Sequence, residues 1–386
     1  MKKGNLAFLF MWGLFLVIFV FCKLPVAIGT DGEANKLPVE KYEKAIVLEV
    51  NEASSSPEQD EHYFTEQIIK VKVLTGEYKG KVVEARNSLS GTRGWDLIVK
   101  PGDKVVLYIT EENGRLSEVY IADMVRTSYL NYLILGFVLS LIIVGGIKGI
   151  KSLVALGFTI LAIYKVLLPF LLKGYSPIPV TVIVLVAVTL LTMFIVGGIS
   201  RKSVAATLGT AGGVVVAGLI AMWVGDLAHL TGYATEESRM LLYVENLKVD
   251  MQGLLFAGII TGALGAIMDV AMSIASSIDE IKKANPGLNR LQLMGAGMNV
   301  GRDIMGTMAN TLILAYTGGA LPLLLLLMAY NTPAIRIFNT ELIATEIVRA
   351  LAGSIGLIVA VPLTAIIAGL LAEKEAQNYS SRIEDF

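Results

Sequence analysis

An aspartate stands in the middle of an apolar stretch, "GALGAIMDVAMSIASSIDEI", which begins at Gly262 and places a carboxylate at Asp269. A charge inside hydrocarbon is costly unless it is paired, hydrated or neutralised. Such a residue indicates either an ion or proton pathway, or a hydrogen bond that locks two helices together. Steps of three or four from Asp269 reach a series of small residues, which predict a face packed closely against another helix. These residues are Gly258, Gly262, Gly265, Ala266, Ser273, Ser276 and Ser277.

A second polar stripe follows in "GMNVGRDIMGTMANTLILAY", which begins at Gly297. Its members recur at steps of three to four residues and therefore share one helical face: Asn299, Asp303, Gly306 and Asn310. We expect a tight hairpin to bring this stripe toward Asp269 as part of one pathway. The alternatives are that Arg302 anchors the helix at the inner membrane boundary, and that Asp303 and Asn310 serve in helix capping or packing.

Asp226 and His229 lie three residues apart in "MWVGDLAHL" and can meet as an ion pair. They are interpreted either as solvated residues at a membrane boundary or as the outer end of a proton route. No metal site is predicted, because one histidine here has no second set of ligands. The single cysteine, Cys22, excludes an intrachain disulfide and a cysteine metal cluster. No cofactor is predicted.

The composition assigns these residues to a membrane protein. The chain of 386 residues is 54% hydrophobic and 17% charged, whereas a soluble domain carries roughly 25% charged residues. Its net charge of -1 gives no general attraction to nucleic acid. The sequence has no P-loop lysine motif, so any energy for transport would come from an ion gradient.

Two segments precede the multispan part. Residues 1–28 are predicted to form an N-terminal anchor, for which a cleaved signal sequence is the alternative. Residues 29–127 are predicted to form a separate small β barrel of the OB type outside the cytoplasm, because apolar and polar residues alternate between turn sequences. Five strands are expected, at Lys44–Val50, Glu66–Gly76, Lys79–Asn87, Asp103–Thr110 and Leu116–Asp123.

Residues 128–373 are predicted to hold seven transmembrane helices, which makes about eight with the anchor. They are expected at Tyr129–Ile147, Leu153–Leu172, Ile178–Ile199, Val204–Leu230, Gly253–Ile278, Ile304–Tyr330 and Ile347–Ala372. Alternate junctions are rich in Lys and Arg, which places both termini, including the tail 374–386, in the cytoplasm. The seventh span contains "TGGALP" from Thr317, so it is either broken or tilted and continuous.

The chain resembles the YibE/F family of bacterial multipass membrane proteins. The resemblance covers the whole chain, and its most characteristic stretches are "GAIMDVAMSIASSIDEI" and "MNVGRDIMGTMANTLILAY". It implies the architecture above, in a bacterial cell membrane, and no particular activity. The last helices also show a fainter similarity to SecF and related proton-driven permeases, which implies proton coupling by analogy.

Three functional classes follow from these observations. A secondary transporter of a small substrate or ion, with the proton as one candidate, explains the polar stripes and the interrupted span. A non-transporting component of an envelope export or assembly complex would instead use the β domain to hold a protein partner. An intramembrane aspartyl hydrolase would use Asp269 and Asp303 as a dyad, but the Gly-x-Gly-Asp signature of such proteases is missing, so no enzymatic activity is predicted.

Overall fold

The computed structural model describes residues 39–384 apart from 52–64, 93, 113–114 and 245–246. The chain divides into two compact units, Ile28–Ser140 and a helical unit made of Met1–Ala27 with Leu141–Phe386. The predicted N-terminal anchor and Cys22 lie outside the described residues.

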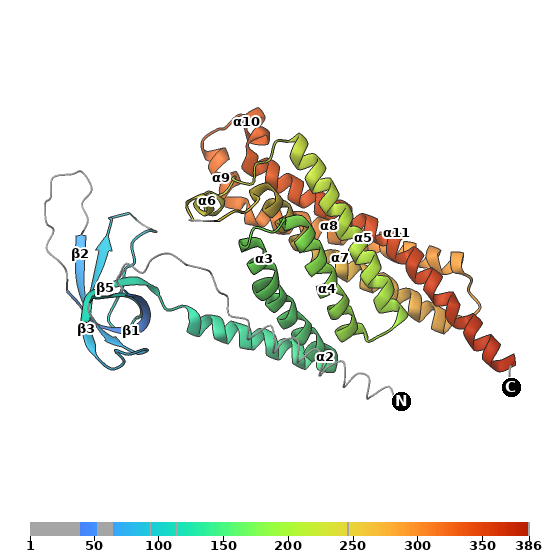
Figure 1. The fold of residues 1–386 in the computed structure, drawn as a ribbon, viewed down its shortest axis with the longest axis horizontal. Helices are drawn as coiled ribbons and strands as arrows, with labels where there is room; N and C mark the ends of the chain where they lie inside the picture. Colours follow the sequence, from blue (N-terminus) through green and yellow to red (C-terminus); the bar gives the residue numbers. More distant parts are fainter. Residues whose placement is uncertain (1–38, 52–64, 93, 113–114, 245–246, 385–386) are drawn as a thin grey trace. The chain divides into compact units, whose positions relative to one another are not determined.

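The first unit contains a closed five-stranded β barrel (Figure 1), which confirms the predicted small β barrel. The strands follow the order β1-β2-β3-β5-β4, with β3 and β5 parallel and the other pairs antiparallel. Alternate residues of each strand fill the interior, because successive side chains of a strand point to opposite faces. The strands are β1 (Val39–Asn51), β2 (Thr65–Val73), β3 (Val82–Leu89), β4 (Lys104–Glu112) and β5 (Arg115–Met124).

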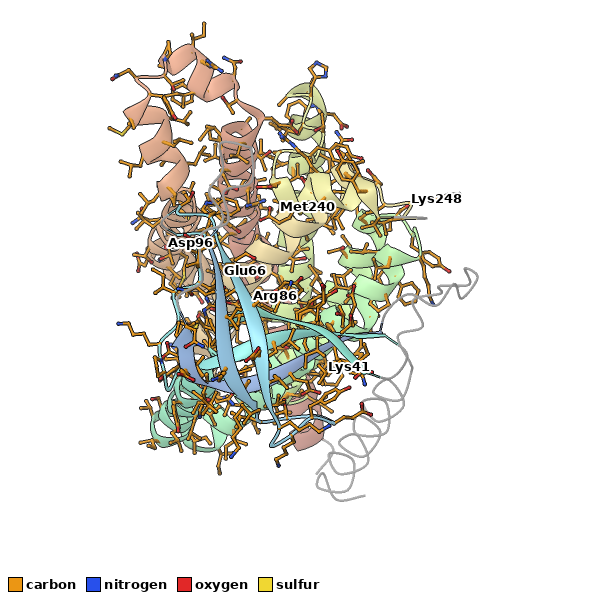
Figure 2. The ribbon with its side chains drawn as sticks, turned by 90° about the vertical axis from the view of Figure 1, so that its left-hand side faces the viewer. Lys41, Glu66, Arg86, Asp96, Met240 and Lys248 are labelled. Atoms are coloured by element: carbon orange, nitrogen blue, oxygen red, sulfur yellow. The ribbon has the colours of Figure 1, made fainter. Side chains whose placement is uncertain are left out.

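Ion pairs lie on the outside of this barrel. Lys41 on β1 places its Nζ 2.6 Å from Glu77 Oε2 and 2.8 Å from Glu111 Oε1. The Glu111 side chain is only 11% exposed, so this pair is better shielded than the others. Figure 2 shows Glu66 and Arg86 on neighbouring strands, with 3.8 Å between Arg86 Nε and Glu66 Oε1. A hydrogen bond from Lys41 has the largest effect in holding the pKa of Glu111 below its usual value, and a hydrogen bond from Tyr78 adds to it.

We expect the isolated barrel, residues 29–127, to fold alone and to lose stability in acid through Glu111. Because the pKa of Glu111 is lower in the folded than in the unfolded protein, ionised Glu111 stabilises the fold at pH values above the unfolded-state pKa of about 4.3. This stabilisation is lost as the pH falls through the folded-state pKa. Glu111→Gln should therefore lower the melting temperature at pH 7 and flatten its fall toward acid pH, as followed by circular dichroism. Glu49→Gln, which breaks the exposed pair with Lys70, is the control and should leave the pH profile unchanged.

The helical unit contains helices long and apolar enough to cross a membrane, five among the described residues, or six if the bent pair α8 and α9 is one span. The predicted total of about eight is not confirmed. The elements are α2 (Thr127–Ala162), the π-helix η1 (Ile163–Leu167), α3 (Leu168–Leu172), α4 (Pro177–Gly197), α5 (Arg201–Leu227), α6 (Glu236–Met240), the 3₁₀ helix η2 (Leu241–Tyr243), α7 (Met251–Ala284), α8 (Arg290–Gly319), α9 (Leu321–Ala329), α10 (Ala334–Asn339) and α11 (Glu341–Glu384).

Part of the difference in count comes from the first candidate span, Thr127–Leu172, which is 46 residues long. A straight helix of this length would measure about 69 Å, more than twice the ~30 Å hydrocarbon core. The helix is interrupted at Gly146, whose φ of 53° and ψ of -132° are not helical. Gly149 then lies against the Leu141 carbonyl, an approach that leaves no room for a Cβ atom. The chain therefore turns sharply inside this segment, where the sequence predicted the junction of two spans.

The core of the helical unit forms where α5, α8 and α11 surround α7 (Figure 1). An isoleucine-rich face of α7 is fully buried there, at Ile260, Ile267 and Ile274. Glycines let α5 and α11 touch through their backbones. A Cβ atom at Gly213 would lie 2.7 Å from the Gly356 carbonyl oxygen, and one at Gly356 would lie 2.6 Å from that of Gly213. Small residues of this kind are the usual means of close packing between membrane helices.

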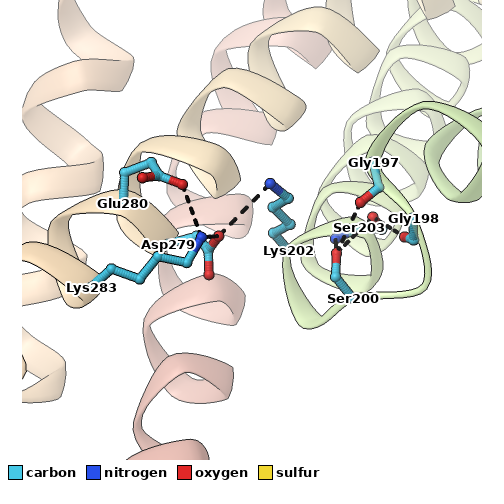
Figure 3. Close-up of polar contacts among 8 residues, drawn as sticks. All are labelled: Gly197, Gly198, Ser200, Lys202, Ser203, Asp279, Glu280 and Lys283. Carbon is cyan, nitrogen blue, oxygen red and sulfur yellow. Dashed lines mark hydrogen bonds and ion pairs between the residues drawn. The ribbon is translucent and has the colours of Figure 1, made fainter. Parts of the chain in front are cut away.

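One end of the helical unit gathers basic and acidic side chains (Figure 3). Asp279 at the end of α7 lies 2.8 Å from Lys283 Nζ and 3.7 Å from Lys202 Nζ at the start of α5. Arg201 donates a hydrogen bond of 2.9 Å to the Leu371 carbonyl oxygen of α11. The basic junctions at Arg201 and at Lys283, and the part of α11 that leads into the tail, therefore lie at one end of the unit. The charge pattern of the sequence had placed them on one side of the membrane.

Candidate functional site

Asp269 lies near the centre of α7. The helix begins after Asp250, whose side chain accepts a hydrogen bond of 2.9 Å from the Gly253 backbone N–H. Asp269 is eighteen residues after Met251 and fifteen before Ala284, or about 27 Å and 22 Å along the axis. The carboxylate therefore sits far from both ends of a helix that is long and apolar enough to cross a membrane.

Asp269 lines a pocket of about 380 Å³ between α7, α4 and the segment from Ser152 to Ile163. The pocket wall is mostly apolar, and four hydroxyl side chains share it with Asp269: Ser152, Thr159, Thr192 and Thr261. Thr159 and Thr261 donate their hydroxyl hydrogens to carbonyl oxygens one turn earlier in their own helices. Their hydroxyl oxygens remain available as acceptors. Within the part of the chain that the structure describes, no side chain or backbone group pairs with the Asp269 carboxylate.

Among the described residues, no helix packs closely against the face of α7 that carries Asp269, which contradicts that prediction for this part of the chain. A Cβ atom at Gly258 or Gly265 would meet nothing within 4 Å, and Ser273 is exposed. Gly262 approaches only the hydroxyl end of Tyr316. The opposite, isoleucine-rich face of α7 packs instead, because larger side chains bury more apolar area against three neighbouring helices. Ser276 and Ser277, which are partly buried, lie about two turns beyond Asp269, toward the charged end of α7.

The polar stripe of α8 does not face Asp269 either. α8 packs against α7 and α11 through the buried residues Leu293, Gly297, Gly301 and Leu312. Asn299, Arg302, Asp303, Gly306 and Asn310 are all exposed. The predicted hairpin of α7 and α8 is present, but it buries the other face of α8. Gly297 and Gly301 explain why this face of α8 is the buried one, because they let the side chains of Ile278 and Val361 lie against the backbone of α8.

The two carboxylates of the aspartyl dyad, Asp269 and Asp303, therefore do not share the Asp269 pocket. None of the residues lining the Asp269 pocket comes from α8. Arg302 Nη1 donates a hydrogen bond of 3.5 Å to Asn299 Oδ1. Among the described residues, neither Asp303 nor Asn310 has a side-chain partner.

Asp226 and His229 are both exposed and do not form the ion pair that their spacing allowed. Asp226 Oδ1 accepts a hydrogen bond of 2.9 Å from Gln252 Nε2 on α7. His229 meets Asp226 only through the backbone, where its N–H donates to the Asp226 carbonyl oxygen at 3.1 Å. Its φ of 52° lies in the left-handed region and ends the helix, so its side chain does not continue the helical spacing on which the prediction relied.

The span with "TGGALP" is broken. α8 ends at Gly319 and α9 begins at Leu321, with Pro322 in its first turn and a bend of 57° between the two axes. Beside the break, Tyr316 and Thr317 line a pocket of about 230 Å³ with Glu346 of α11. Sequence reasoning missed Glu346. The available signal in the sequence was a basic residue, Arg349, three residues after Glu346 in an apolar helix, which is the spacing of an ion pair. In the structure Arg349 Nη1 lies 2.6 Å from Glu346 Oε1.

The described residues contain no group of three or more His, Cys, Asp or Glu side chains that could hold a metal ion. The apolar helices and the pocket fit a helical membrane protein with a separate β barrel and with an exposed carboxylate, Asp269, on the wall of an open pocket in its helical unit. The chain belongs to the YibE/F family: the model of the YibE/F-like protein matches residues 133–374, and that of the YibE/F family N-terminal domain matches residues 38–124. No curated protein and no solved structure matches the chain.

Proposed function

We propose that this protein is a secondary transporter in the bacterial cell membrane, driven by an ion gradient, and that its substrate or coupling ion passes the pocket at Asp269. The observation that carries the proposal is a carboxylate at mid-helix that has no partner among the described residues and lies on the wall of a pocket of about 380 Å³. A carboxylate in that position exchanges a proton or binds a cation, because both neutralise its charge.

The surrounding residues take supporting roles in this proposal. Ser152 and Thr192 offer hydroxyl groups to a bound ion or small polar substrate from two other elements of the pocket wall. Ser273 and Ser276, on the turns of α7 after Asp269, continue a polar route toward the charged end of the unit. The exposed stripe of α8 and the pair Asp226 and His229 lie outside the pocket, so the pathway is restricted to Asp269 and its neighbours.

The proposal includes about eight spans, with both termini in the cytoplasm and the barrel outside. The gathering of Arg201, Lys202 and Lys283 at one end of the helical unit supports it, because basic residues are enriched on the cytoplasmic side. Reporter fusions at Lys282 and after Phe386 should both indicate a cytoplasmic location, and one inside the barrel at Gly80 an external one. Opposite locations for Lys282 and Phe386 would contradict the arrangement.

The second candidate is a non-transporting component of an envelope complex that holds a protein partner through the barrel. A groove of about 470 Å³ between β3 and β5 favours it, with a mixed polar and apolar wall that includes the charged side chains of Glu84, Arg86 and Glu118. The strands pair there only at Arg86 and Tyr120, so much of both edges is free to accept a peptide strand.

Gradient-driven flux in proteoliposomes separates the two candidates. The purified full chain is reconstituted, a proton or sodium gradient is imposed, and a panel of ions and small metabolites is followed with time. Flux above that of empty liposomes, retained when the barrel groove is altered by Arg86→Glu, supports transport. No flux for any member of the panel, together with loss of a cellular phenotype in Arg86→Glu, would favour the envelope component.

A further inference from the structure

The exposed polar face of α8 needs a cover if this helix enters the bilayer. Asn310 lies seven residues beyond Asp303, about 10 Å further along the helix. Arg302 can extend its long side chain to a membrane surface, but a short amide at Asn310 cannot. A polar side chain turned toward hydrocarbon is costly, so it normally faces protein or water.

Six of the exposed positions of α8 have the spacing of a coiled-coil seam. Successive steps of four, three, four, three and four residues connect them, which is the alternation of the a and d positions of a heptad. Each of them is exposed in the structure. They are Asn299, Asp303, Gly306, Asn310, Ile313 and Thr317, and we call them the α8 seam.

We propose that the α8 seam is the interface between two copies of this chain, related by a two-fold axis along the membrane normal, in which each Asp303 pairs with the partner's Arg302. In a parallel pair of helices, a side chain at position a enters a hole formed by four residues of the facing helix. For Asp303 these are the partner's Asn299, the partner's Arg302, the partner's Asp303 and the partner's Gly306. A two-fold axis repeats each contact, so the two ion pairs are reciprocal.

Two further seam residues fit the same arrangement. Asn310 occupies an a position, where a buried asparagine pairs with its own copy and fixes both register and the number of helices. Gly306 occupies a d position, and a Cβ atom there would meet nothing within 4 Å. A glycine at this position lets two helix backbones approach closely. The seam supplies hydrogen bonding and shape that complement themselves, and Arg302 beside it supplies the charge opposite to that of Asp303.

The chain's own N-terminal segment is a poorer cover. Residues 6–22 contain no amide, carboxylate or basic side chain, so this stretch offers neither an ion pair to Asp303 nor an amide partner to Asn310. A second copy supplies both partners at the right depth, because identical helices related by the two-fold axis place identical residues level with each other.

Cysteine crosslinking of the full chain in membranes tests the proposal. In a Cys22→Ser background, Ile313→Cys places a thiol on the seam and keeps all its polar residues, whereas Ala315→Cys places one on an exposed position off the seam. Seam thiols of a parallel pair fall within the Cα separation that a disulfide spans. We expect a covalent dimer on non-reducing gels for Ile313→Cys and none for Ala315→Cys.

Charge reversal then tests the ion pair. Arg302→Asp alone or Asp303→Arg alone places like charges together and should lower the crosslinked fraction about fivefold or more. The double variant restores opposite charges and should recover the dimer, which shows that the single variants were folded. Absent or equal crosslinking at positions 313 and 315 would overturn the proposal. So would a seam crosslink that is unchanged by both charge reversals, or a crosslinked product that contains another protein.

Discussion

Asp269→Asn should abolish gradient-driven flux, to the level of empty liposomes, while the protein expresses and melts as the wild type does. Asparagine keeps the size and the hydrogen-bonding capacity of the side chain but cannot exchange a proton or carry a charge. If the carboxylate in the pocket is the coupling group, no neighbour replaces it, because no described residue near it carries a second carboxylate. The measurement is flux into proteoliposomes across a range of pH, beside thermal unfolding in the same detergent.

The alternative role for Asp269, a hydrogen bond that locks two helices, makes opposite predictions. Under that alternative Asp269→Asn restores the bond and keeps activity, and Asp269→Ala loses about 1 kcal/mol of stability, the usual size of such a bond in membranes. Since Asp269 has no partner among the described residues, we expect Asp269→Ala to unfold at nearly the wild-type temperature and to be as inactive as Asp269→Asn. Full activity in Asp269→Asn would end the proposal of ion coupling.

The barrel could be predicted from sequence almost completely. Alternation of apolar and polar residues states directly which side chains enter a barrel, and glycine-rich turns such as those at Gly76 and Gly102 mark where strands end. Ala45, Val47, Val105 and Leu107 fill the interior as the pattern requires. Strand ends shifted by a few residues, because pairing with a neighbour rather than local composition decides where a strand stops.

The helical unit could be predicted less well, for a physical reason. In a membrane the lipid is as apolar as the core, so hydrophobicity locates a span but does not say which of its faces meets a neighbour. On α7 the glycine and serine face was expected inside, and the isoleucine face is buried instead. On α8 the spacing correctly placed Asn299, Asp303 and Asn310 on one face. Only the structure shows that α7 and α11 pack against the opposite face.

Gly265→Phe should block flux without destabilising the protein. Gly265 lines the Asp269 pocket, and a Cβ atom there would meet nothing within 4 Å, so a phenyl ring can extend into the space that a substrate would use. Glycine is the weakest ordinary helix former, less favourable than alanine by about 1 kcal/mol, and its replacement inside α7 should leave the melting temperature unchanged or slightly raised. The measurement is the initial rate of flux in proteoliposomes, with the reconstituted amount of protein matched to wild type.

Gly258→Phe is the matched control for this substitution. Gly258 lies seven residues earlier on the same face of α7, and it also has nothing within 4 Å of a Cβ position, but it does not line the pocket. Both variants therefore add the same ring to an open position of the same helix, and only one ring stands beside Asp269. Transport through the pocket requires Gly265→Phe to lose flux and Gly258→Phe to keep it. Equal flux in the two variants would mean that the substrate does not pass Asp269, even if Asp269→Asn is inactive.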